Sequence, residues 1–247
     1  MKALVTGATG FVGGNLVRAL VEEGVPVRAL VRNTSSSQAF QGLPIEETLG
    51  DLEDIDSLKA ALKGCTVLFH VAALNTFWVR NPAQFYNVNI GGTRNILAAA
   101  AEMGVERVVH TSTWAIIGRP SEGELATEDT LPNQEDLTGH YRQTKYLAER
   151  EVDAAVSRGQ DVVILNPTVP VGPWDVKPSP SGRIVLDFLR GRMPAYIGAH
   201  LNLIAVEDVA QGHIRAWKHG RTGERYILGN QNMTLLQVLK GLEKITG

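Results

Sequence analysis

This 247-residue chain contains very little cysteine and has a net charge close to zero. Cys65 is its single cysteine, and 24 Lys and Arg nearly balance 26 Asp and Glu, for a formal net charge of −2. A lone cysteine has no internal disulfide partner, and its place beside a predicted buried strand indicates a core thiol in a reducing cytoplasm. The small net charge argues against electrostatic binding of nucleic acid or anionic membranes.

Long apolar runs and metal-binding patterns are also missing. No run approaches the ~20 apolar residues that span a membrane, so we expect no membrane span. No pair of the six histidines combines metal-ligand spacing with acidic neighbours, so we expect no metal site. The composition, 44% hydrophobic and 20% charged residues, is typical of a globular protein. The chain is long enough to form one large domain.

Apolar runs of strand length alternate with longer segments that have helical periodicity. The regular alternation predicts an α/β fold, a doubly wound parallel sheet with helices on both faces. The predicted strands are 3–6, 25–31, 45–49, 66–71, 107–111 and 161–166, and the predicted helices are 12–23, 55–62, 82–103 and 141–158.

After residue 166 the sequence becomes rich in proline and glycine, and the predicted elements become short. They are a helix at 184–190, a strand at 202–206, a helix at 207–218, a strand at 225–228 and a helix from 235. We expect them to form a smaller lobe over the carboxyl edge of the sheet, where open parallel sheets bind ligands.

Three glycines follow the first predicted strand at a spacing that suits a dinucleotide pyrophosphate. Gly7, Gly10 and Gly13 lie between the strand and the next helix. Gly7 would allow the tight turn, Gly10 the close approach of phosphates, and Gly13 the packing of helix on strand. The helix dipole favours the pyrophosphate at the N–H groups of the helix start.

The end of the second predicted strand indicates which dinucleotide binds. Folds specific for NAD place a carboxylate there for the ribose 2′-OH. This chain has Arg32, followed by Asn33, Thr34 and three serines. A guanidinium pairs with a 2′-phosphate through two hydrogen bonds, and hydroxyls can donate to it. We therefore predict NADP(H) in preference to NAD(H).

Tyr141 and Lys145 are four residues apart in a predicted helix, so they lie on one face. A phenol has a pKa of about 10 and exchanges protons poorly at pH 7. A nearby ammonium would bring that pKa towards the working range. The lysine could also hold the ribose hydroxyls. The pair therefore predicts proton transfer coupled to hydride transfer, with either Ser112 or Thr113, at the end of the fifth strand, as a hydroxyl partner.

These motifs together resemble the extended branch of the short-chain dehydrogenase/reductase superfamily, the NAD-dependent epimerase/dehydratase family. The resemblance covers essentially the whole chain. Stretches such as GHYRQTKYLAERE and NPTVPVGPWDVKPSPSGRIVLDFLRGRMPAY look like the hopanoid-associated sugar epimerases, which border the dihydroflavonol 4-reductase-like enzymes. Relatives of this type continue well past the position of Gly247, so the lobe is expected to be truncated.

The resemblance also implies roles for individual residues. Thr113 takes the catalytic hydroxyl position, and Asn89 matches an asparagine that bends a helix and holds a water in a proton relay. Asp51 and Leu52 would lie at the adenine. The implied cofactor-binding set is Gly7, Thr9, Gly10, Phe11, Val12, Gly13, Arg32, Asp51, Leu52, Val71, Ala72, Ala73, Tyr141, Lys145, Pro167, Thr168 and Val169. Substrate-side candidates are Asn75, Phe77, Trp78, Arg80, Trp114, His140, Asn166, Trp174, Arg183 and Asn202.

The sequence thus predicts a Rossmann-type NADP-binding domain at 1–166 and a partial substrate-binding lobe at 167–247, packed on the same domain. The predicted activity is an NADP-dependent oxidoreductase or epimerase that moves a hydride at a carbinol or ketone carbon of a sugar-like or hopanoid-linked substrate. Alternatives are a dihydroflavonol 4-reductase-like ketone reductase acting on a flavonoid-like substrate and a non-catalytic NADP-binding module. A homodimer through the helices 82–103 and 141–158 is expected from the resemblance.

Overall fold

The computed structural model describes residues 1–76 and 79–246, and its largest element is a parallel sheet of seven strands. The strand order is β3-β2-β1-β4-β5-β6-β9. All seven strands were predicted from their apolar runs, with ends within two residues of those observed. They are β1 (Ala3–Thr6), β2 (Val27–Val31), β3 (Glu46–Leu49), β4 (Val67–His70), β5 (Arg107–Thr111), β6 (Val162–Pro167) and β9 (Arg225–Leu228).

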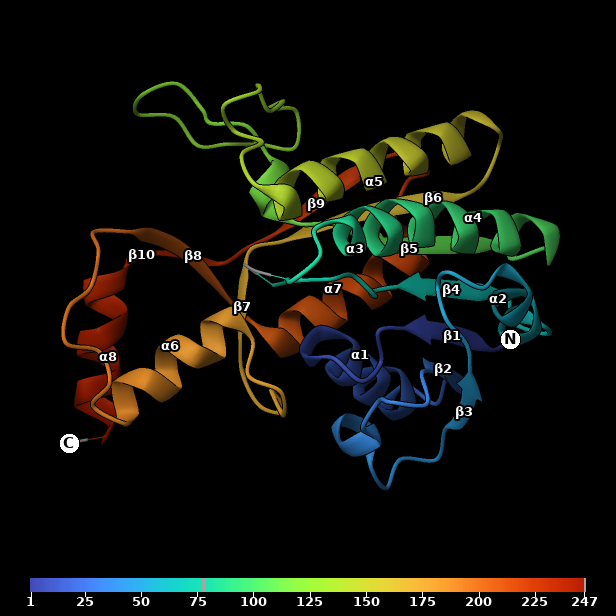
Figure 1. Ribbon diagram of the computed structural model, residues 1–247, viewed down its shortest axis with the longest axis horizontal. Coiled ribbons are helices and arrows are strands. Elements are labelled where there is room, and N and C mark those ends of the chain that lie inside the picture. Colours follow the sequence, from blue (N-terminus) through green and yellow to red (C-terminus); the bar gives the residue numbers. More distant parts are fainter. Residues whose placement is uncertain (77–78, 247) are drawn as a thin grey trace.

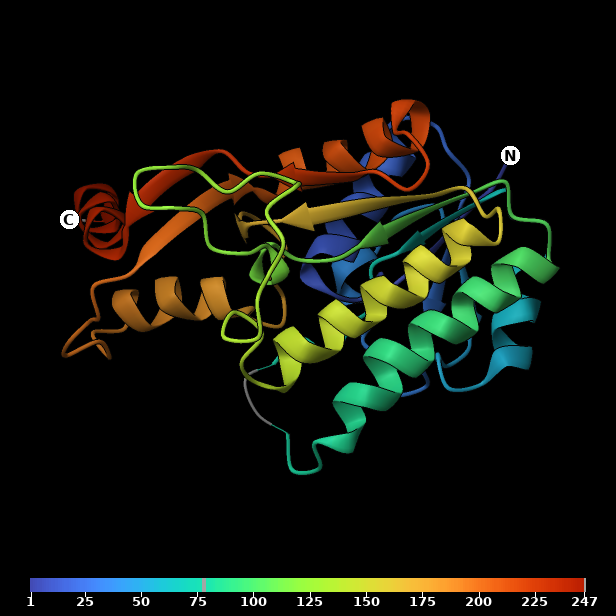
Figure 2. The ribbon, with the colours of Figure 1, turned by 90° about the horizontal axis from the view of Figure 1, so that it is seen from above.

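Helices cover both faces of this sheet (Figures 1 and 2). On one face, side chains of α1 (Phe11–Glu22) and α7 (Val206–His219) join a core of strand residues. On the other face, α2 (Ile55–Leu62), α4 (Gly92–Glu102) and α5 (His140–Ser157) bury their apolar sides. The predicted core position of Cys65 is confirmed, because the thiol is buried in this second core. The doubly wound arrangement is therefore the one predicted.

The segment after residue 166 does not form a separate lobe alone. Part of it joins the large sheet and its helices, and the rest forms a small second sheet. Its strand β9 pairs with β6 at the edge of the large sheet, and α7 packs against α1. The rest forms a small sheet with the order β10-β8-β7, flanked by two helices at one end of the molecule (Figure 1). These elements are β7 (Val169–Val171), α6 (Pro180–Leu189), β8 (His200–Ala205), β10 (Gln231–Thr234) and α8 (Leu235–Thr246).

The predicted helix 82–103 is interrupted, which corrects the sequence-based prediction. It consists of α3 (Ala83–Phe85), the wider π-turn η2 (Tyr86–Gly91) and α4. The buried Asn89 lies in the π-turn, and its side chain accepts a hydrogen bond from the Leu74 backbone N–H at 2.7 Å. A single wide turn of this kind is often found at functional sites. Within the described residues, no helix is both long and apolar enough to cross a membrane.

Candidate active site

The loops after β1 and β4 come together at the carboxyl edge of the large sheet, and two glycines make this possible. Gly7 has a positive φ of 71°, and a Cβ on it would lie 2.7 Å from the Ala72 backbone nitrogen. A Cβ on Gly13 would lie 2.2 Å from the Gly7 carbonyl oxygen. Side chains at these two positions would push the helix and the β4 loop away from the strand. The roles predicted for both glycines agree with this packing.

The amino end of α1 is a ready anion site. Gly10 is the N-cap residue and provides no side chain, and the first turn contains no acidic residue. A Cβ on Gly10 would meet only the Gly7 carbonyl oxygen, at 3.2 Å, among the described atoms, so protein packing demands this glycine less than the other two. The first N–H groups of α1, from Phe11 and Val12, point out of the helix end. The loop that contains Gly7, Gly10 and Gly13, here called the glycine cradle, and the uncapped start of α1 together fit a dinucleotide pyrophosphate.

The other predicted cofactor residues line the same edge. Arg32 follows β2 and is exposed, and its turn is closed by hydrogen bonds with Ser35. The Asp51 carboxylate accepts from the Glu53 N–H at 3.0 Å, while Leu52 is buried against Gly92. The remaining members lie beside the glycine loop or at the ends of β4 and β6; they are Thr9, Val71, Ala72, Ala73, Pro167, Thr168 and Val169.

Tyr141 meets Thr113 where the start of α5 faces the end of β5. A hydrogen bond between their side chains lowers the phenol pKa, but burial has the larger, opposite effect, so the pKa of Tyr141 is raised above its usual value. This corrects the prediction that Lys145 would lower it. The reason is that the phenol loses hydration. The Tyr141 hydroxyl carries its proton at neutral pH, as an ordinary phenol does, and the raised pKa makes it a weaker acid in the free protein.

Lys145 is buried one turn further along α5. Its Nζ donates to the Thr111 carbonyl oxygen at 2.8 Å. Burial lowers its pKa to about 8, while the carboxylate of Glu149 acts in the opposite direction. Its ammonium thus lies beside the carboxyl end of β5, close to the Tyr141–Thr113 pair, as the helical spacing predicted.

The other two predicted catalytic residues have different surroundings. Ser112 is buried, and its Oγ has no hydrogen-bond partner among the described residues. The contact with Tyr141 is made by Thr113, so the geometry favours Thr113 of the two hydroxyls. Asn89 donates to Thr144 Oγ1 at 3.1 Å and to the Leu74 carbonyl oxygen at 3.4 Å, which ties the π-turn to α5. Its role in a proton relay stays a prediction.

Several substrate-side candidates make structural contacts instead. Asn166 is fully buried and donates to the Thr113 carbonyl oxygen at 3.0 Å. Asn202 donates to Asn232 at 2.8 Å and so joins β8 to β10. Trp174 lies under the Arg18 guanidinium, 3.6 Å from its ring centroid. These three side chains hold loops and strands in place.

The remaining candidates within the described residues are all exposed. His140 lies beside Tyr86, whose hydroxyl is 3.3 Å from Nδ1. Phe77 and Trp78 lie outside the described residues. The exposed ones are Asn75, Arg80, Trp114, His140 and Arg183.

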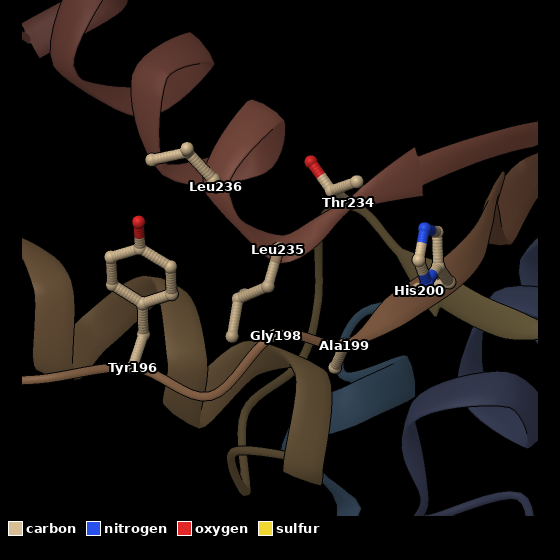
Figure 3. A pocket seen from close by; sticks show the side chains of 7 residues that line it. All are labelled: Tyr196, Gly198, Ala199, His200, Thr234, Leu235 and Leu236. Carbon is tan, nitrogen blue, oxygen red and sulfur yellow. The ribbon is translucent and has the colours of Figure 1, made fainter.

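Two pockets lie in the segment beyond residue 166. One of about 320 Å³ runs from Phe11, at the start of α1, to Val185 and Leu186 of α6. The other, of about 270 Å³, is lined mostly by apolar groups: Figure 3 shows the Tyr196 ring on one side and Leu235 and Leu236, at the start of α8, on another. Neither pocket is lined by Tyr141, Thr113 or Lys145.

The chain belongs to the NAD dependent epimerase/dehydratase family, whose sequence pattern matches residues 3–229. It is 51% identical to a provisionally named dihydroflavonol 4-reductase of Synechocystis, over 98% of this chain and 72% of that protein. It is 40% identical to sterol demethylase protein B of Methylococcus capsulatus, over 100% of this chain and 75% of that protein. The solved structure of gox2253 matches with a TM-score of 0.93 and 43% identity, over 99% of this chain and 74% of the other.

These comparisons confirm the predicted resemblance to the extended short-chain dehydrogenase/reductases and the predicted fold. They place the chain in a family of NAD(P)-dependent epimerases and oxidoreductases. One set of contacts had not been predicted: Glu149 and Arg225 form a buried ion pair beneath Lys145. The sequence held one signal for it, since Glu149 follows Lys145 by four residues on the same helix.

Proposed function

We propose that this protein is an NADPH-dependent reductase that converts a ketone on a flat, largely apolar ring system to the carbinol. The observation that supports it best is the contact of Tyr141 with Thr113 beside the glycine cradle. The phenol carries its proton at pH 7, and ketone reduction needs a proton donor at the substrate oxygen.

Each residue has one task in this proposal. Bound NADPH supplies the hydride. Tyr141 Oη donates a proton to the ketone oxygen, and the Thr113 hydroxyl orients that oxygen. The Lys145 ammonium, next to the Thr111 carbonyl, holds the ribose hydroxyls. The uncapped N–H groups of α1 bind the pyrophosphate.

The relatives support a net reductase over a sugar epimerase. The two with 51% and 40% identity have names that refer to a dihydroflavonol and a sterol, which are both polycyclic compounds.

Incubation with NADPH and a dihydroflavonol tests the reaction class. We expect absorbance of NADPH at 340 nm to fall in step with formation of the carbinol, measured by chromatography. A nucleotide-sugar in place of the dihydroflavonol should leave NADPH unchanged and give no product. A sugar epimer formed without net loss of NADPH would overturn the proposal in favour of epimerisation. Tight cofactor binding without turnover on any ketone would favour the non-catalytic module.

Arg32 is the residue proposed to select NADP(H). Arg32→Ala should weaken NADPH binding by about 10–100-fold, the loss expected for a charge-assisted phosphate contact, and leave NADH binding nearly unchanged. Fluorescence titration with both dinucleotides measures the two affinities. Arg80→Ala is a suitable control, because Arg80 is also exposed but follows β4 rather than β2. Equal or tighter binding of NADH by the unmodified protein would contradict the assignment.

A further inference from the structure

Glu149 is a fully buried carboxylate one helical turn beyond Lys145. Its Oε1 lies 2.5 Å from the Arg225 guanidinium, and its Oε2 accepts from Asn166 at 3.5 Å. A buried carboxylate is costly unless a cation and hydrogen-bond donors compensate for the lost water. Here Arg225 and Asn166 supply them from the sheet, and Arg150, on α5 itself, lies 3.8 Å from the same Oε1.

The partners of Glu149 connect it to the rest of the site. Arg225 starts β9 and lies opposite Ile164 of β6 in the register of the sheet. Asn166 lies one residue before the end of β6, and the same amide nitrogen that reaches Glu149 also donates to the Thr113 carbonyl oxygen. One buried group of side chains thus holds both the lysine-bearing helix and the loop with the proposed catalytic hydroxyl.

The groups that face Lys145 differ in charge. From β4 and β5 come His70 and His110, and burial together with the Lys145 charge lowers the pKa of both, so they are neutral. Tyr141, on α5, is protonated because burial raises its pKa. The guanidinium of Arg225, on β9, is paired with Glu149. Among these described groups, Glu149 is the one that brings negative charge to the ammonium.

We propose that Glu149, held in place by Arg225 one helical turn from Lys145, is a positioning residue that brings negative charge to the Lys145 side chain and so favours its ammonium form, while the Thr111 carbonyl oxygen holds that ammonium in place. The inference rests on the proposed function for the role of Lys145, and deepens it by naming the groups that maintain that role. Glu149 itself touches neither the substrate nor the reacting atoms, and it acts through Lys145.

Nuclear magnetic resonance titration of ¹³C-labelled lysine tests the inference directly. The Lys145 signal is assigned by its absence in Lys145→Arg. We expect a midpoint of about 8 in the unmodified protein, and a midpoint lower by about one pH unit in Glu149→Gln, because the nearby negative charge is lost. NADPH affinity at pH 8, measured by fluorescence, should fall several-fold in the same variant.

Two further variants separate this effect from loss of structure. Glu151→Gln removes a carboxylate from the same helix, but Glu151 pairs with Arg94 at the surface, so the Lys145 midpoint should not move. Glu149→Gln combined with Arg225→Met removes the pair together and leaves no unpaired guanidinium, so it should fold and still show the lower midpoint. An unchanged Lys145 midpoint in this folded double variant would overturn the inference. Full reductase activity of Tyr141→Phe would overturn the proposed function instead.

Discussion

Tyr141→Phe should lower the rate of ketone reduction by about 10²–10⁴-fold and leave NADPH binding nearly unchanged. The substitution keeps the aromatic ring and its packing at the start of α5 and removes only the hydroxyl. That hydroxyl contacts Thr113 and keeps its proton, because burial raises the phenol pKa. What is lost is therefore the proton donor at the substrate oxygen. The rate of ketone reduction is measured from the fall in NADPH absorbance at saturating NADPH. The affinity for NADPH is measured by fluorescence titration.

Tyr146→Phe is the matched control. It makes the same chemical change on the same helix, but Tyr146 packs against the Arg150 guanidinium, 4.9 Å from its ring centroid. Its kcat should stay within about twofold of the unmodified protein, as for a surface change. Thr113→Ser keeps a hydroxyl and should retain most activity, while Thr113→Val should lose it. Equal kcat values for Tyr141→Phe and Tyr146→Phe would refute the mechanism.

The large sheet could be predicted from the sequence because each of its strands is marked by a pattern within a few consecutive residues. Runs such as VVHT in β5 and VVILNP in β6 are mostly apolar, which is typical of strands covered on both faces. Gly13 is required by contacts with Gly7 and Ala8, a few residues away, and Gly7 by the backbone of Val71 and Ala72. The glycine spacing between strand and helix was nevertheless enough to locate the predicted cofactor loop. Tyr141 and Lys145 are one helical turn apart, and a helix brings such residues to one face.

The contacts that escaped prediction join residues far apart in the chain. Arg225 and Glu149 are 76 positions apart, and nothing local to β9 indicates which carboxylate its arginine meets. The direction of the Tyr141 pKa shift failed for a related reason: the four-residue spacing shows the nearby lysine but not how deeply the phenol is buried. β7 and β10 were missed because a proline-containing triplet and a polar run gave no apolar pattern.

A loss of about 4 kcal/mol of stability between pH 7 and pH 5, from two buried histidines, is the second large effect that we expect. His70, His110 and His213 are buried in the core around β4, β5 and α7. Burial lowers the pKa of His70 to about 3 and that of His213 to about 4, and holds that of His110 well below its usual value. His70 and His213 are therefore mostly neutral in the folded protein at pH 5.

Their contacts explain why protonation is so unfavourable. His213 Nδ1 lies 2.7 Å from the Val209 carbonyl oxygen, so it carries the ring proton, and Nε2 accepts from Thr111 Oγ1 at 2.8 Å. A second proton would remove that acceptor. Neither ring nitrogen of His110 has a hydrogen-bond partner among the described residues, so a cation there would be buried unpaired beside Lys145.

The sign of the pH effect follows from which state binds the protons. Well above pH 6.5 the three histidines are neutral in both states, and no stability is lost. As the pH falls through about 6.5, the unfolded chain takes up protons on these side chains that the folded protein does not accept until its lower pKa values are reached. At pH 5, His70 and His213 then contribute a loss of about 2 kcal/mol each, and His110 acts in the same direction. A loss of about 4 kcal/mol is a large part of the whole stability of many domains.

Urea unfolding at pH 7, 6 and 5, followed by circular dichroism, measures this loss. His110→Leu should reduce it, because neither ring nitrogen has a hydrogen bond to lose and leucine does not titrate. His219→Gln is the control: His219 is exposed in the last turn of α7, so its replacement should leave the pH dependence unchanged. A His110→Leu protein with the same decline in stability as the unmodified chain would show that carboxylate protonation, not these histidines, drives the acid unfolding.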